Sequence, residues 1–209
     1  ASFAMARQLN VFSKTRNSGV SFRQWDLDVV AERNQWSVFT KIPDWYEGFD
    51  EEYKIGNSGT IIVWKKADRL LKIAPTPQGL SKIITNLSEY VGAVFSRFLS
   101  GKSPIKMQIM EHRIVPWDPV AGGRTRARQV INSGLTITPY VMPHQSAYDD
   151  QAEFKRLGGL KGWNAQQGIY IYRRDRLIVN GGWLSSKMKN DEHTKLARII
   201  FDIGSESDL

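Results

Sequence analysis

Residues 167–183 read Gln-Gly-Ile-Tyr-Ile-Tyr-Arg-Arg-Asp-Arg-Leu-Ile-Val-Asn-Gly-Gly-Trp. Apolar and aromatic residues alternate on both sides of a charged step, and a Gly-Gly pair ends the run, which predicts a β-hairpin with a basic tip. We expect the buried face to carry the aliphatic residues Ile169, Ile171, Leu177 and Val179. Tyr170 and Tyr172 are expected on the opposite face. An ordinary hairpin with a solvated tip gives the same pattern.

Composition limits what this hairpin can belong to. The 209 residues are 41% hydrophobic, enough for one large domain or two smaller ones, and we favour two. There is no cysteine, which excludes disulfides, thiolate metal sites and cysteine nucleophiles and is compatible with a reducing compartment. No apolar run approaches the roughly 20 residues that span a bilayer, and residues 1–6 do not form a secretory leader. We therefore expect a cytoplasmic protein with no membrane partner.

The charge balance is basic. The formal net charge is +8, which favours an anionic partner such as DNA, RNA or a nucleotide. Lysines and arginines that only solvate the surface would give the same net charge.

The first part of the chain is rich in strand patterns. Alternation predicts antiparallel strands at residues 7–13, 19–28 and 35–42. Residues 43–53 are acidic and aromatic and show neither strand nor helix periodicity, so we interpret them as a loop with a helical turn. The β-branched run at 59–64 predicts a fourth strand buried on both faces.

A proline-rich step at residues 75–79 is the predicted boundary between two domains. After it, apolar residues recur at helical spacing from Leu80 to Phe98, and Gly101 and Pro104 end the predicted helix. Phe95 is expected in the core, and Arg97 on the solvated face.

The rest of the chain mixes both element types. We expect a strand pair or one long strand within residues 105–115, a strand at 129–142 broken by Gly134 and Pro139, and a short helix within 147–157. Residues 189–203 are expected to begin as helix and end as strand.

Catalytic motifs are missing from the sequence. His112, His144 and His193 are far apart, and none has a second ligand at metal-binding spacing. No nucleophile elbow, phosphate loop or dinucleotide fingerprint occurs. We therefore assign no catalytic residue and no metal ligand, and interpret the chain as a binding or coupling module.

Two basic stretches are candidate nucleic-acid contacts. Arg124, Arg126 and Arg128 alternate, so an extended chain would direct all three toward one side. Arg173 and Arg174 at the hairpin tip, next to tyrosines, offer phosphate contacts and base stacking. Both stretches are also compatible with solvated loops.

Several motifs, taken in order, resemble one superfamily. They are Gly-Thr-Ile-Ile-Val-Trp at 59–64 followed by Asp-Arg-Leu at 68–70, the stretch 1–14, Trp-Asp-Pro at 117–119, Gly-Trp-Asn-Ala-Gln-Gln-Gly at 162–168, and the hairpin itself. Together they resemble the GHKL ATPases, which include gyrase B, the heat-shock chaperone, histidine kinases, MutL and MORC, and are most similar to bacterial MORC-like or chaperone-like members. Arg174 departs from the pattern, because Asn is common at its position.

The resemblance implies an α+β fold. Residues 1–74 would be the C-terminal part of a GHKL-type ATP-binding domain, an antiparallel sheet remnant of a Bergerat-type fold. Residues 75–209 would be a transducer domain with a left-handed βαβ crossover, an exception to the usual handedness. The implied function is an ATP-dependent clamp or remodelling ATPase, in which the transducer couples nucleotide state to DNA or protein handling.

Site residues follow from the resemblance one at a time. Thr60 matches the threonine whose hydroxyl supports the adenine-binding aspartate, Gly59 lets the backbone approach closely, and Ser2 lies near the phosphate end of the helix after the ATP lid. ATP and Mg are implied for the parent protein. The magnesium-binding Asn/Glu helix, the adenine motif and the phosphate-sensing lysine would lie outside residues 1–209, so this chain alone is expected to be inactive and to bind no nucleotide tightly.

The expected partners are the remaining ATPase-domain segment of the parent protein, a second copy in a homodimer, and DNA. The alternative function is a stand-alone basic module that binds nucleic acid or dimerises, with a fold like that of the transducer.

Overall fold

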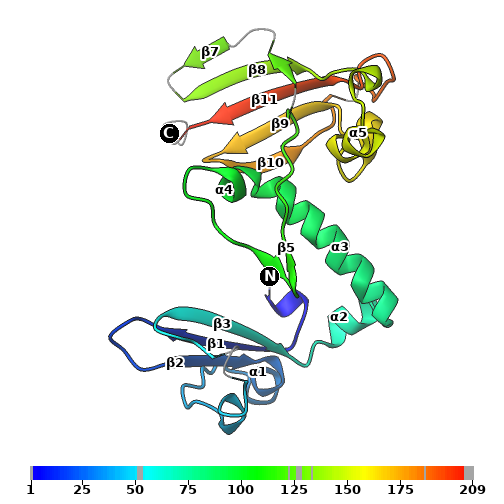
Figure 1. Ribbon diagram of the computed structural model, residues 1–209. Coiled ribbons are helices and arrows are strands. Elements are labelled where there is room, and N and C mark those ends of the chain that lie inside the picture. The colour runs from blue at the N-terminus through cyan, green and yellow to red at the C-terminus, as the bar shows by residue number, and fades with distance from the viewer. Residues whose placement is uncertain are drawn as a thin grey trace. The chain divides into compact units, whose positions relative to one another are not determined.

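The computed structural model describes residues 2–50, 54–121, 123–125, 129–132, 134–185 and 187–204 (Figure 1). These residues form an α+β structure with antiparallel and mixed sheets, as expected, in two compact units, Ala1–Leu80 and Ser81–Leu209. None of the helices in the described residues has both the length and the apolar character needed to span a membrane.

The elements of the first unit are η1 (Ser2–Ala4), β1 (Gln8–Lys14), β2 (Ser21–Asp26), α1 (Leu27–Arg33), η2 (Asp44–Tyr46), β3 (Gly59–Lys65) and α2 (Asp68–Ile73). β1 is the central strand of a sheet ordered β2-β1-β3, antiparallel to both neighbours. The predicted strand at residues 35–42 is wrong. Only an isolated bridge between Gln24 and Phe39 forms there, because the chain first turns through α1 and ends it at Asn34 with a positive φ of 50°.

The two faces of this sheet differ. Phe12 and Phe22 are fully buried on one face, where Tyr46 of η2 stacks on Phe12 with 4.3 Å between ring centroids. On the other face Ile62 and Trp64 of β3 remain 59% and 44% exposed. The predicted burial of β3 on both faces is therefore wrong within the described residues, because the aromatic cluster covers one face only.

The predicted long helix is confirmed as α3 (Pro77–Val94) followed by α4 (Ser96–Ser100), with a break at Phe95 and Gly101 at the end. Proline is well tolerated in the first turn of a helix, where its missing N–H has no intrahelical partner. Burial is concentrated at the C-terminal end of α3, at Gly92, Ala93 and Val94. A Cβ on Gly92 would lie 2.4 Å from the carbonyl oxygen of Val115, so only glycine permits this approach.

The remaining elements, which belong to the second unit, are β4 (Gln108–Ile109), β5 (His112–Arg113), β6 (Arg124–Thr125), β7 (Gln129–Asn132), β8 (Leu135–Val141), η4 (Gln145–Ala147), α5 (Gln151–Leu157), α6 (Gly162–Ala165), β9 (Gly168–Arg173), β10 (Arg176–Asn180) and β11 (Ala197–Ile203). Of the two alternatives for residues 105–115, the strand pair forms, as β4 and β5, and α5 is the short helix expected within 147–157. Residues 192–196 form turns instead of the predicted helix before β11.

The main sheet of the second unit has the order β10-β9-β11-β8-β6, with β7 also paired to β8. β9 and β11 are parallel, and the other neighbours are antiparallel. The predicted break at Gly134 separates β7 from β8. The predicted break at Pro139 is wrong: Pro139 pairs with Ile199 inside β8, and neither β6 nor β7, as far as the structure describes them, pairs with it on the other side.

The hairpin is confirmed as β9 and β10, joined at Arg174 and Asp175. Both have positive φ, 47° and 63°, as a two-residue type I′ turn requires. The predicted orientation of its faces is wrong. Tyr170 and Tyr172 are 0% and 2% exposed and pack with Ala93 of α3 in the core, together with Leu177. Period-2 alternation gives the two faces but not which of them meets the helix.

Candidate functional site

The Gly-Thr pair lies at one end of the sheet of the first unit. The hydroxyl groups of Thr60 and Ser13, directly opposite on β1, are 3.0 Å apart, and the Ser13 hydroxyl also donates to the carbonyl of Gly59 at 3.4 Å. Both Gly59 and Thr60 are exposed, and Gly59 has a φ of 153°. This end of β3 therefore offers a hydroxyl pair and a backbone that another segment can approach.

Ser2 lies at the opposite end of the same strands. Its carbonyl accepts from the backbone amides of Met5 and Ala6 at 3.0 and 3.1 Å. The backbone amide of the nearby Arg7 donates to the carbonyl of Lys66, just beyond the end of β3. On β1, Gln8 pairs with Lys65 and Ser13 pairs with Thr60, so the two ends are five residue steps apart. At about 3.4 Å per residue this is about 17 Å along the strand. The structure thus does not bring Ser2 and Thr60 together, although both are at the ends of one sheet.

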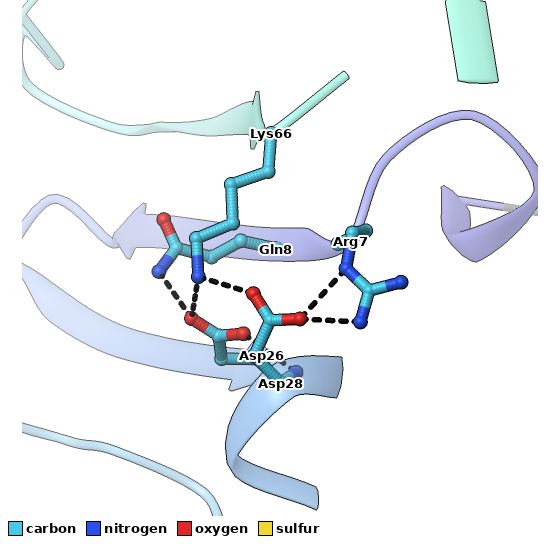
Figure 2. Close-up of polar contacts among 5 residues, drawn as sticks. All are labelled: Arg7, Gln8, Asp26, Asp28 and Lys66. Atoms are coloured by element: carbon cyan, nitrogen blue, oxygen red, sulfur yellow. Dashed lines mark hydrogen bonds and ion pairs between the residues drawn. The ribbon is translucent and has the colours of Figure 1, made fainter. Parts of the chain in front are cut away.

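A charged cluster lies at the end of the sheet where β1 begins and β3 ends (Figure 2). Its members are Arg7 just before β1, Gln8 at the start of β1, Asp26 and Asp28 where β2 turns into α1, and Lys66 after β3. The Lys66 ammonium donates to Asp26 at 2.9 Å and to Asp28 at 2.6 Å. Arg7 donates through Nε to Asp28 at 2.7 Å, and Gln8 donates to Asp26 at 2.9 Å. The cluster joins all three strands of the sheet.

Both carboxylates of the cluster are ionised at neutral pH. Burial acts to raise the pKa of Asp26, but hydrogen bonds from Lys66 and from the Asp28 amide outweigh it, and the net pKa lies below the ordinary value. The hydrogen bonds from Lys66 and Arg7 lower the pKa of Asp28. A general acid needs a raised pKa, so this pair is suited to holding strands together and not to proton transfer at neutral pH.

The hairpin tip of the second unit is held by Arg97 of α4. Its guanidinium forms ion pairs with Asp202 of β11 and, at 3.3 Å, with Asp175 of the turn, and it lies 3.6 Å from the ring centroid of Tyr172. Arg176 lies over Phe95, 5.7 Å from its centroid. Arg97 is therefore a structural cation, contrary to its predicted place on the solvated face.

The two predicted basic stretches do not form one patch. Arg124 pairs with Val141 at the end of β8, whereas Arg173 pairs with Ile203, which pairs with Leu135 at the start of β8. Val141 and Leu135 are six residues apart along β8, so Arg124 and Arg173 are separated by about 20 Å along the strand direction. Arg126 and Arg128 lie outside the described residues, and Arg174 is in the turn beside Arg173.

Sequence reasoning missed a buried polar centre at Gln167, which is 0% exposed. Its amide nitrogen donates to the backbone carbonyls of Asn164 and Asp191 at 2.7 and 3.1 Å, and its oxygen accepts from the Trp183 indole at 3.2 Å and from the Thr194 hydroxyl. One side chain thus fixes the segments before β9, after β10 and before β11. A glutamine next to the glycine that starts a buried strand is the only signal in the sequence.

Arg198 is also fully buried. It donates to the Lys195 carbonyl at 3.1 Å and lies over the rings of Trp163 and Tyr170, 5.3 and 5.9 Å from their centroids. Burial lowers its pKa. Its Nε and Nη2 atoms have no hydrogen-bond partner within the described part of the chain, so the aromatic rings provide much of its stabilisation.

Nothing in the described ranges groups three or more metal-ligating side chains. No protein-family model matches the sequence, and no curated protein is similar to it.

Proposed function

We propose that this chain is the end of a GHKL-type ATP-binding domain followed by a transducer domain, and that it couples nucleotide state to the handling of DNA or another protein. Residues 1–74 would complete a Bergerat-type sheet, and residues 75–209 would form the transducer with a left-handed βαβ crossover. ATP and Mg would bind the parent protein, where Thr60 and Gly59 approach the adenine end and Ser2 the phosphate end.

One observation supports this proposal most strongly, the open apolar face of the first unit. Ile62 and Trp64 pair across β1 with Val11 and Leu9, so these four side chains share the face opposite the Phe12 cluster. Ile62 and Trp64 are 59% and 44% exposed. An exposed apolar sheet face is normally covered by another layer, and helices of the remaining ATPase-domain segment would provide that layer.

The positions of the site residues agree with the proposal. Adenine and the triphosphate are at opposite ends of an extended nucleotide, and Thr60 and Ser2 are at opposite ends of β1 and β3. Movement of a transducer against its ATPase domain would transmit the nucleotide state.

The test uses the longer parent protein. Its coding sequence should contain an Asp-x-Gly-x-Gly motif upstream of Ala1, and Thr60→Val should weaken ATP binding at least tenfold by calorimetry. Thr60→Ser, which keeps the hydroxyl, should bind like wild type. Thr85→Val is the matched control, because the Thr85 hydroxyl is in the second unit and donates to the Ser81 carbonyl within α3. Lack of the motif, or wild-type affinity in Thr60→Val, would refute the assignment.

The isolated chain gives a second, independent check. Residues 1–209 should show no tight ATP binding and no turnover in the presence of Mg. Micromolar binding by this chain would mean that the nucleotide site has been placed on the wrong residues.

A further inference from the structure

Two buried polar atoms of the second unit have no hydrogen-bond partner within the described residues, and both belong to residues that line one cavity. They are the indole nitrogen Nε1 of Trp117 and the side-chain oxygen Oδ1 of Asn180, the last residue of β10. The cavity has a volume of about 120 Å³. Burying a donor or an acceptor without a partner is unfavourable, so such atoms at a cavity indicate a polar occupant.

The structure holds the Trp117 indole in place. Its backbone N–H donates to the Gly92 carbonyl at 3.0 Å, and its ring packs against the core, 6.2 Å from the ring centroid of Tyr170. Gly159, with a φ of 72°, lies against the same ring, because a Cβ there would be 2.6 Å from Cζ2 and 2.9 Å from Cε2 of Trp117. Asn180 in turn pairs with Tyr170 in the β9–β10 ladder. The donor and the acceptor are therefore both anchored to the core, as a preorganised binding site requires.

The size and the walls of the cavity suit one flat ring. Ala93, Leu160 and the indole of Trp117 contribute apolar lining. Apolar cavities of about 150 Å³ bind a single six-membered ring. The matching occupant has a ring with an acceptor for Trp117 Nε1 and a donor for Asn180 Oδ1. A ring amide supplies both, because its C=O and N–H are adjacent, and uracil- and thymine-type bases carry this group on the edge that proteins read.

A larger groove of about 580 Å³ adjoins the cavity, since Glu89, Trp117 and Leu160 line both spaces. Lys155 and Arg156 of α5 also line the groove. No ion pair in the described part of the chain involves either cation. The charged side chains that line the two spaces are three cations and one acid, which favours an anionic ligand: Lys155, Arg156, Lys161 and Glu89.

We propose that the cavity and the groove bind a pyrimidine nucleotide with a uracil- or thymine-type base. The base enters the cavity, where its C=O accepts from Trp117 Nε1 and its ring N–H donates to Asn180 Oδ1. The phosphate contacts Lys155 and Arg156 in the groove. All four residues belong to the second unit, so the proposal does not depend on the ATPase assignment.

A carboxamide side chain of a peptide is the competing occupant, because it carries the same donor and acceptor. The nucleotide is favoured by the shape and the charge of the site. A carboxamide brings no ring to fill the cavity and no negative charge for Lys155 and Arg156.

The probe is uridine monophosphate (UMP), titrated into the full chain by calorimetry at low salt. Four comparison ligands accompany it: uridine, UMP methylated on the ring N–H, adenosine monophosphate (AMP) and N-acetylglutamine amide. We expect each to bind at least tenfold more weakly than UMP. Uridine lacks the phosphate, methylated UMP lacks the donor for Asn180, AMP adds a second ring, and the glutamine derivative lacks both ring and charge.

Asn180→Leu should weaken UMP binding at least tenfold, because it removes the acceptor. In this variant UMP and methylated UMP should bind within twofold of each other, which a merely destabilised fold would not produce. Asn86→Leu is the matched control, since Asn86 is exposed on α3 and lines neither space, and it should bind UMP like wild type.

The phosphate contact has its own variants. Lys155→Ala combined with Arg156→Ala should reduce the affinity for UMP to that for uridine and leave uridine binding within twofold of wild type. Lys189→Ala, at an exposed cation outside both spaces, is the control and should change neither affinity.

Trp117 gives a direct spectroscopic readout. Its indole N–H signal in a proton–nitrogen spectrum can be identified among the seven tryptophans by its loss in Trp117→Phe. This signal should shift when UMP is added, because the N–H gains an acceptor.

Octauridylate distinguishes the two sources of such a ligand, and either result supports the site. Affinity equal to that of UMP assigns a free nucleotide, whereas an affinity more than tenfold higher that is lost in Asn180→Leu assigns a nucleotide within a single strand. Four results would overturn the proposal. They are no binding of UMP up to about 1 mM at low salt, equal binding of UMP and its methylated form, unchanged affinity in Asn180→Leu of proven fold, and binding of AMP or the glutamine derivative that is as tight as that of UMP.

Discussion

The guanidinium of Arg97 in α4 lies 3.6 Å from the ring centroid of Tyr172 in β9, and the same group is ion-paired with Asp202 in β11. One side chain of the helix thus contacts two neighbouring strands of the sheet. Burial acts to lower the pKa of Arg97, but Asp202 outweighs it and the net pKa is raised, so the cation is favoured in the folded state.

Arg97→Ala should therefore destabilise the chain by about 1–2 kcal/mol, the range of a partly desolvated cation–π contact with modest ion pairs. Urea unfolding followed by circular dichroism measures the change. Arg97→Lys should cause a smaller loss of stability, because lysine keeps the positive charge but cannot stack a planar guanidinium on the Tyr172 ring. Arg23→Ala, at a residue exposed in β2, is the control and should change stability by less than about 0.5 kcal/mol. Equal effects of the two alanine variants would contradict the role given to Arg97.

Alkaline pH should destabilise the second unit through its two core tyrosines. Burial raises the pKa of Tyr172 to about 12 and raises the pKa of Tyr170 as well. A raised pKa means that the folded state retains the proton, so this stability is fully present below pH 10, the ordinary value, and is lost as the pH rises through the folded pKa.

Absorbance at 295 nm measures the titration of these phenols. In native protein, Tyr170 and Tyr172 should ionise only above the ordinary phenol pKa of 10, and Tyr172→Phe should remove one late-titrating phenol. If the absorbance change lost in Tyr172→Phe occurs near pH 10 while the protein remains folded, Tyr172 is not buried as described.

Acid should weaken the first unit through the cluster in Figure 2. The pKa values of Asp26 and Asp28 are both lowered in the folded state. Their contribution to stability is therefore present above the unfolded carboxyl pKa near 4 and is lost as the pH falls through the lower folded values. Asp26→Asn should make the free energy of unfolding less dependent on pH in this window and lower it at pH 7.

Lys66→Met should change the dependence of the free energy of unfolding on pH in the same acidic range, because it removes the ammonium group that hydrogen-bonds both Asp26 and Asp28. Lys82→Met, on α3, is the control and should leave the pH profile unchanged. A profile of Lys66→Met that superimposes on wild type would show that Lys66 does not set these pKa values.

Duplex DNA, if it binds, should bind weakly and without sequence preference. We expect a dissociation constant no tighter than about 10⁻⁴ to 10⁻⁶ M at physiological salt, and a linear fall of log affinity with log salt. Each Arg→Ala that removes a phosphate contact should reduce the slope by about one. Because Arg124 and Arg173 are about 20 Å apart along the sheet, their effects should add. No binding at low salt would exclude DNA contact for this chain.

Local patterns were sufficient where the physical cause is local. Alternation around Arg174 and Asp175 predicted the hairpin, because a two-residue turn with positive φ fixes its own register. Helical spacing after the prolines predicted α3 and α4. The end of the helix was also predictable, because it is set locally by Gly101. These elements, with the strands, were enough for the α+β class.

Tertiary structure decided which faces are buried. Alternation separates Tyr170 from Ile171 but does not say that α3 packs on the tyrosines, because that depends on where residues 92–94 approach the sheet. The same reason explains Ile62 and Trp64, whose β-branched and aromatic character is typical of a buried strand although one face is open.

Functional groups distant in sequence were beyond any local pattern. Asp26 and Lys66 meet only because β1 pairs with both β2 and β3, and Gln167 gathers three segments only because β9, β10 and β11 are adjacent. The sequence by itself determined the turns, the helix ends and the residue types available for a site. Strand pairing, which depends on burial between residues far apart in the chain, decided that Thr60 and Ser2 occupy opposite ends of one sheet and that the β9–β10 hairpin ends the order of the described strands in the main sheet.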